Sequence, residues 1–313
     1  MKNKVITIVL VAVVATLAFS CSKETGQVDT VRNITFTADD FILSDEGLPA
    51  TKTSLVGNTT SFVWSAADTA GVFPSTGGQV YFTMESGAGA NSAPFNGGGW
   101  GLLSSEDYYS YYPFVGDIYL DRNKIPVSYL GQKQVGASSS DHIGQCDFMY
   151  SKGELSGQSL SFNYHHMSCI IRAKVTLPAG TYTKLAVTAP TKVFVTKGWF
   201  DLMATTPTIV GETYFTQLGI DLESFESDGT TPIYVYIVSA PLEIQGMDIT
   251  FSALNSERKE FQCHKTPAGY QGAGYGAGTM YSPTCSTWTE VPQSMGLILE
   301  EWGEGGRISG TAD

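Results

Sequence analysis

The stretch MDITFSA, residues 247–253, decides the fold class, because apolar and polar residues alternate along it. Successive side chains of a β-strand point to opposite faces, so this alternation predicts a strand with one buried face. Residues 171–177, IRAKVTL, alternate in the same way, and residues 233–238, IYVYIV, are apolar on both faces, as in a central strand. No long window after residue 21 has helical periodicity, so the pattern predicts an all-β protein.

Other short runs have the same strand character, and 34 Gly and 13 Pro separate them. Many short strands with frequent turns favour β-sandwiches. The further strand candidates are residues 34–37, 61–64, 80–84, 108–112, 160–164, 184–188, 193–196 and 297–299.

The charge composition of the chain argues against a nucleic-acid partner. Charged residues make up 15% of the chain, below the roughly 25% of an average soluble domain. The formal net charge is −12, and loss of residues 1–20, which hold two lysines and no acidic residue, would make it −14. A surface this acidic repels nucleic acid, so no nucleic-acid partner is expected. The same charge also serves simple solubility.

The first 20 residues have the pattern of a signal peptide. Lys2 and Lys4 precede an apolar run at residues 5–19, which is too short to favour a membrane span. The stretch LAFSC, residues 17–21, resembles a lipobox, although Phe19 is bulkier than is usual at its position. The alternative is an ordinary signal peptide beside an unrelated cysteine.

A lipobox implies that the Cys21 thiol receives a diacylglycerol group after the signal peptide is removed. The two acyl chains of this group hold a protein stably on a bilayer. Ser22 follows Cys21, where an aspartate would signal retention in an inner membrane. We therefore expect a surface-exposed lipoprotein of the outer membrane.

Four cysteines remain, and an even number in an oxidising compartment permits two disulfides in three connectivities. A bridge between Cys263 and Cys285 is the first choice, because both flank one Gly-rich segment, and buried free thiols are the alternative. No C-x-x-C or H-x-x-x-H spacing occurs, so no metal site is expected.

A polar stretch with two glycines, SKGELSG at residues 151–157, predicts a domain boundary. The expected organisation is a lipoprotein signal peptide, a tether with a leading strand, an N-terminal β-sandwich and a C-terminal β-sandwich, over residues 1–20, 21–52, 53–157 and 158–313.

Five segments stand out in chain order: ATKTSL (50–55), SFVWSAADTAGVF (61–73), YYSYYP (108–113), LSFNYHHMS (160–168) and AGTMY (277–281). In this order they resemble five motifs of the fimbrillin family, the pilins of type V pili. The family's motifs are a basic loop, W-x-x-x-D-x-x-G-V-F, an aromatic strand ending in Tyr-Pro, the start of the second domain, and A-G-x-x-Y.

The resemblance implies two transthyretin-like Greek-key β-sandwiches and a structural or adhesive subunit of a cell-surface pilus. In that family a protease cuts after a basic residue and removes a leading strand, and a neighbouring subunit donates a replacement strand. Carried over to this chain, the removed strand is residues 33–42, with Ile34, Phe36 and Ala38 filling the groove. The cut would follow Lys52, with Arg32 as the alternative site, although arginine is more familiar than lysine there.

A removable strand is expected at the edge of a sheet, so we predict residues 34–37 to be an edge strand with an exposed loop at Lys52. Its loss would expose unpaired backbone groups and apolar pockets, and a donated strand would satisfy both. The C-terminal candidate donor, residues 297–302, is short and is followed by a Gly-rich break. A tip or accessory subunit is therefore as plausible as a stalk pilin.

The sequence carries no pattern of catalytic residues, so the chain is expected to be a non-enzyme without a cofactor. His165 and His166 are adjacent in a strand and point to opposite faces, so they cannot bind one metal together. The Gly-rich residues 272–278 lack the strand-loop-helix context of a phosphate-binding loop.

A glycan or a host protein is the alternative partner, bound by a surface lipoprotein that does not polymerise. Exposed Tyr and Trp could stack on such a ligand, whereas alternate rings in strands would pack the core. The rings in question are Tyr108, Tyr109, Tyr111, Tyr112, Trp100, Trp199, Tyr270 and Tyr275.

Overall fold

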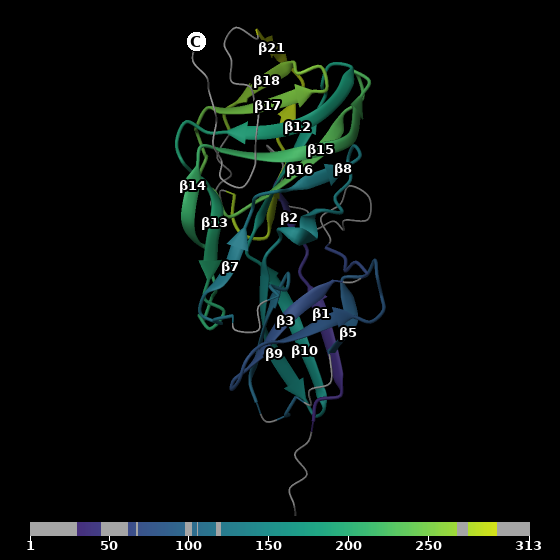
Figure 1. Ribbon diagram of the computed structural model, residues 1–313, viewed down its shortest axis with the longest axis vertical. Coiled ribbons are helices and arrows are strands. Elements are labelled where there is room, and N and C mark those ends of the chain that lie inside the picture. Colours follow the sequence, from purple (N-terminus) through teal and green to yellow (C-terminus); the bar gives the residue numbers. More distant parts are fainter. Residues whose placement is uncertain are drawn as a thin grey trace, which may run out of the picture.

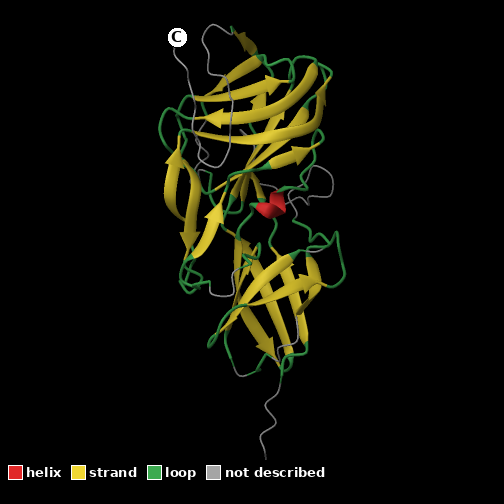
Figure 2. Ribbon diagram, in the orientation of Figure 1, coloured by secondary structure: helices red, strands yellow, loops and turns green. Residues whose placement is uncertain are grey.

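The computed structural model describes residues 30–44, 62–66, 68–97, 102–104, 106–116, 120–267 and 275–292. Regular structure in this part of the chain is β-sheet except for one 3₁₀-helix, η1 (Ile143–Gln145), as Figure 1 and Figure 2 show. The predicted all-β class is confirmed. Within these residues no helix has the length and apolar character needed to cross a membrane.

Seven strands form a first sheet that closes on itself, in the order β1-β10-β9-β6-β3-β4-β5, with β5 pairing back to β1. Its core is mostly aromatic and includes Phe36, Trp64, Phe162 and Tyr164. The strands are β1 (Asn33–Ala38), β3 (Thr69–Pro74), β4 (Val80–Met84), β5 (Ser92–Gly97), β6 (Tyr108–Tyr112), β9 (Met149–Ser156) and β10 (Ser159–His166).

The other strands form three sheets around a second, larger core, stacked on the first along the long axis in Figure 1. One sheet runs β16 (Ile233–Ser239), β11 (Cys169–Val175), β19 (Thr279–Tyr281), β2 (Ile42–Ser44), with β20 (Thr284–Cys285) also on β11. The next runs β21 (Thr289–Val291), β18 (Glu260–Lys265), β17 (Ile249–Asn255), β12 (Gly180–Thr188), β15 (Gln217–Ser227), β8 (Lys133–Val135). The third runs β14 (Val210–Phe215), β13 (Phe194–Phe200), β7 (Ile125–Ser128). The assignment to two transthyretin-like sandwiches stays a prediction.

The stretch at residues 151–157 does not separate two sheets. It ends in the turn between β9 and β10, which pair with each other through Ser156 and Ser159. Gly157 adopts a φ of 60°, which suits a tight turn, and a polar stretch with glycine is as typical of a hairpin as of a linker. The chain leaves the first sheet after His166, and β11 opens the next sheet at Cys169.

Most alternating runs form strands near their predicted bounds, but residues 62–64 do not. Trp64 instead bonds a neighbouring turn, because its N–H donates to Ala90 O at 2.9 Å and its O accepts from Gly89 N–H at 2.9 Å. Its indole N–H donates to Phe36 O at 3.2 Å and to Asn91 O at 3.0 Å. The tryptophan is therefore fully buried in the first core without belonging to a sheet.

The remaining positions of the motif at residues 64–73 also have structural roles. Asp68 Oδ2 accepts from the Ser65 N–H at 2.7 Å, and Asp68 Oδ1 accepts from the Tyr112 hydroxyl at 2.9 Å. A Cβ on Gly71 would lie 2.2 Å from Cε1 of the buried Tyr111 ring, so this position admits no side chain unless the ring moves. The motif therefore sets the packing between β3 and β6.

The expectation that residues 34–37 form an edge strand is wrong. β1 pairs in parallel with β10 along Asn33–Ala38 and antiparallel with β5 over residues 35–37. The strand is interior because the sheet closes through it. The edge position belongs to the next strand, β2, which pairs only with β19 among the described strands of its sheet. The leading segment therefore takes part in two sheets.

Candidate functional site: the leading strand and its anchor

The leading strand β1 supplies the centre of the first core. Phe36 is fully buried, and its ring centroid lies 4.2 Å from that of Phe95 and 5.0 Å from that of Phe162. Ala38 is also buried, and Ile34 packs against the same cluster while half-buried. The three residues predicted to fill the groove thus share the inward face of the strand.

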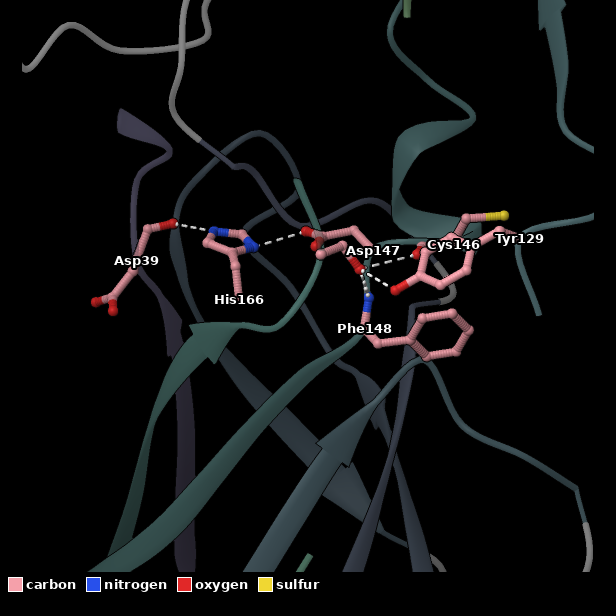
Figure 3. Close-up of polar contacts among 7 residues, drawn as sticks. Asp39, Tyr129, Cys146, Asp147, Phe148 and His166 are labelled. Carbon is pink, nitrogen blue, oxygen red and sulfur yellow. Dashed lines mark hydrogen bonds and ion pairs between the residues drawn. The ribbon is translucent and has the colours of Figure 1, made fainter. Parts of the chain in front are cut away.

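Asp39, directly after β1, ties this strand to the end of β10. Its N–H donates to Tyr164 O at 3.0 Å. Its carboxylate Oδ2 lies 2.6 Å from His165 Nδ1 on the exposed side, and its carbonyl O lies 2.7 Å from His166 Nε2 on the buried side. Three contacts from one residue therefore anchor the C-terminal end of the leading strand, and Figure 3 shows the buried one.

The buried histidine also meets a buried carboxylate. His166 Nδ1 lies 2.7 Å from Asp147 Oδ2, and both side chains are almost wholly excluded from solvent (Figure 3). A carbonyl oxygen only accepts, so His166 Nε2 carries a hydrogen for Asp39 O. One further proton lies between His166 Nδ1 and Asp147 Oδ2, and it makes the pair either an imidazolium with a carboxylate or two neutral groups.

The hydroxyl of Ser168, two residues after His166, forms its hydrogen bonds with other groups. Its Oγ accepts from the Phe148 N–H at 3.0 Å and lies 3.0 Å from the Tyr129 hydroxyl and 3.3 Å from Cys146 O. Among the described residues no hydrogen bond joins this serine to His166. The three side chains therefore lack the contact that a Ser-His-Asp nucleophile requires. The buried hydrogen bonds of His166 instead connect the end of β10 to Asp39 and Asp147.

Two opposing effects determine the protonation of the pair. Burial works to lower the pKa of His166, but the Asp147 carboxylate and the Asp39 carbonyl raise that pKa above its ordinary value overall. Burial also raises the pKa of Asp147, against the effect of His166. The shared proton is therefore held to a higher pH than an exposed histidine would hold it.

This proton makes stability depend on pH. Because the pKa of His166 is higher in the folded than in the unfolded chain, its stabilisation is complete below about pH 6.5 and is lost as the pH rises through the folded pKa. We expect the free energy of unfolding from urea titrations to fall as the pH rises above about 6.5. The fall should be smaller in His166→Asn, and parallel curves for the two proteins would contradict this assignment.

The predicted site residues fall into two groups. Cys21 and Lys52 lie outside the described residues, so lipidation and cleavage stay predictions. Arg32 is exposed directly before β1. Cys263 in β18 and Cys285 in β20 are both buried, and the thiol of the first hydrogen-bonds the thiol of the second.

The sequence did not indicate the anchor at Asp39 or the buried pair. The expectation that His165 and His166 point to opposite faces is confirmed, since the first is exposed and the second buried. The adjacent histidines were the only signal, and no spacing connects them to Asp39, which lies 126 residues before His165. The sequence does not mark Asp147 as a buried residue either, because a single aspartate in a loop is normally exposed to solvent.

The structure buries four of the six described rings that could have bound a sugar. Tyr108, Tyr111, Tyr112 and Tyr275 are buried, and Tyr109 and Trp199 are half-buried. Trp100 and Tyr270 lie outside the described residues. The interpretation that these tyrosines pack the cores is confirmed for the four buried ones.

No protein-family model and no curated protein sequence matches the chain. A structure of a provisionally assigned cell adhesion protein from Bacteroides ovatus is similar over 84% of this chain and 96% of that protein, with 16% identity and a TM-score of 0.52. The fimbrial anchor protein Mfa2 from Porphyromonas gingivalis covers 83% of this chain and 95% of its own, with 12% identity and a TM-score of 0.34.

A fimbrial assembly protein from Parabacteroides distasonis covers 84% of this chain and 96% of its own, with 9% identity and a TM-score of 0.36. Identities this low show the fold alone, and of these three structures the Bacteroides ovatus protein has a TM-score high enough to carry that comparison. The structural neighbours of this chain are cell adhesion and fimbrial proteins, as its resemblance to the fimbrillin family implies.

Proposed function

We propose that the chain is a structural or adhesive subunit of a cell-surface pilus. It is exported as an outer-membrane lipoprotein through Cys21 and joins other pilus subunits by strand donation after its leading strand is removed. The observation that carries the proposal is the place of β1, which pairs on both sides and supplies Phe36 to the centre of a core. The likeness in fold to a provisionally assigned cell adhesion protein supports it.

Removal of β1 would leave an open groove that another strand could fill. The backbone of β10 would lose partners along six residue positions, and that of β5 along three. The space left by Phe36 and Ala38 would be lined by apolar and aromatic side chains. Unpaired backbone on two sides with side-chain pockets between them selects an extended peptide of alternating pattern.

The interior position changes how such an exchange would proceed. Taking a buried phenylalanine out of its core costs about 3–5 kcal/mol, judged from Phe→Ala substitutions. β2 must also leave β19, and Asp39 must leave both histidines. We therefore infer that a cut after Lys52 does not by itself release the strand, and that an incoming strand displaces β1 step by step.

The N-terminus of protein taken from the cell surface tests the proposal. Cleavage after Lys52 gives a chain that begins at Thr53, and cleavage after Arg32 gives one that begins at Asn33. We expect mass spectrometry to find Thr53. A single lipid-modified terminus at Cys21 would defeat cleavage and would favour a lipoprotein that binds a glycan or a host protein without polymerising.

A matched pair of variants connects cleavage to assembly. Lys52→Ala is expected to abolish the ladder of polymers in gels of unboiled cell-surface protein, because the leading strand stays covalently attached. Lys192→Ala removes a lysine that lies exposed between β12 and β13, and it should leave the ladder unchanged. An undiminished ladder in Lys52→Ala would contradict cleavage at this residue.

A further inference from the structure

Two of the four described cysteines come from different sheets and meet inside the second core. Cys263 lies in β18, where it pairs with Phe251 of β17. Cys285 lies in β20, where it pairs with Val175 of β11 in the neighbouring sheet. The side chains are 3% and 0% exposed, and the Cys263 thiol hydrogen-bonds the Cys285 thiol.

The other two thiols have different surroundings. The Cys169 Sγ–H donates to Ala240 O at 3.3 Å. Cys146 lies beside Asp147, and burial raises the pKa of its thiol to about 12. Both are therefore held as protonated thiols, which are poor nucleophiles in disulfide exchange.

We propose that Cys263 and Cys285 form a disulfide that joins the two sheets through β18 and β20, while Cys146 and Cys169 stay reduced. Formation in the cell rests on the proposed function, because it requires export to an oxidising compartment. The pairing itself rests on the contact between the two thiols. The sequence alone left three connectivities open, and this contact selects one bridge.

A disulfide-bearing oxidant such as glutathione disulfide is the co-reactant. The Cys263 thiolate attacks one sulfur of the oxidant, forms a mixed disulfide and releases the first glutathione thiolate. The Cys285 thiolate then attacks the Cys263 sulfur and releases the second. The protein loses two electrons, and its two thiol protons end on the two glutathione molecules. Both attacks take place during folding, before the two sulfurs are buried.

The bridge would close a loop over residues 264–284 and restrict the unfolded chain. Loops of about this size stabilise a protein enough to shift the melting temperature of a domain by about 5–10 °C. Because both sulfurs are buried, the disulfide should resist dithiothreitol in the folded protein and become reducible only in denaturant.

Refolding in a glutathione redox buffer, followed by alkylation and peptide mapping, tests the pairing. The full chain carries Cys21→Ala, so that only four thiols compete. We expect one disulfide, between the peptides that contain Cys263 and Cys285, and alkylated Cys146 and Cys169. Four alkylated thiols, or a bridge to either of the other cysteines, would overturn the proposal.

Two variants guard against a folding artefact. Cys263→Ser should lose the bridge and the stabilisation of about 5–10 °C, whereas Cys146→Ser should keep both. Equal melting temperatures for oxidised wild type and Cys263→Ser would count against the bridge. Protein isolated from cells separates the two proposals: a bridge that forms in the redox buffer but is absent from cell-derived protein supports the pairing and counts against export.

Discussion

Replacement of Phe36 by alanine is expected to lower the free energy of unfolding by about 3–5 kcal/mol. The ring is fully buried and contacts other rings on all sides, including Phe95 and Phe162, so its loss leaves a cavity that rigid neighbours cannot fill. Urea unfolding followed by circular dichroism measures the change.

The matched control is Thr35→Ala, one residue earlier on the same strand but on its exposed face. This change is expected to cost less than about 0.5–1 kcal/mol, which covers a surface substitution and the lower strand propensity of alanine. Equal losses in the two variants would mean that β1 does not supply the core. If the chain is cut after Lys52, as the proposed function requires, Phe36→Ala should also exchange its strand faster, because less packing opposes displacement.

Replacement of Asp147 by alanine is expected to cost about 3–5 kcal/mol, because it leaves the buried His166 without a partner at Nδ1. The loss should be greatest at low pH, where His166 must either carry an uncompensated charge in the core or give up its proton. Urea titrations at pH 5 and pH 8 measure the difference.

A second aspartate–histidine pair in the same molecule serves as the control. Asp39 and His165 lie 2.6 Å apart, but each side chain is 55% exposed, so solvent screens their attraction. Asp39→Ala should therefore cost at most about 1 kcal/mol, and its carbonyl contact with His166 remains. If Asp39→Ala and Asp147→Ala lower the free energy of unfolding equally, burial does not explain the contribution of Asp147 to stability.

The two sites act on the same segment. Phe36 holds the middle of β1 in the core, and Asp39 with the buried pair holds its end. On the proposed function, these contacts would keep the strand in place until another strand competes for both its backbone partners and its pockets. They would thereby prevent early loss of the strand and exposure of unpaired sheet backbone.

Local pattern alone determined the all-β class and the place of most strands. The alternation along residues 247–253 and 171–177 predicted β17 and β11 to within two residues, because burial of one face imposes a period of two on the sequence. The same signal failed at residues 62–64, where Trp64 uses its backbone for a turn and its ring for the core.

Only the tertiary structure decided which strands are neighbours. Alternation shows that a strand has an inner face and is silent about its partners, so nothing near residues 33–38 indicated that β10, more than 120 residues later, lies beside it. Closure of the first sheet made β1 interior, placed Asp39 against both histidines, and brought His166 to Asp147. The contact between Cys263 and Cys285 likewise depends on two sheets meeting, which no local spacing encodes. A strand is predicted by the alternation of its own residues, which is a local property of the sequence. The pairing of strands and the closure of a sheet depend instead on the free energy of burying apolar groups from the whole chain.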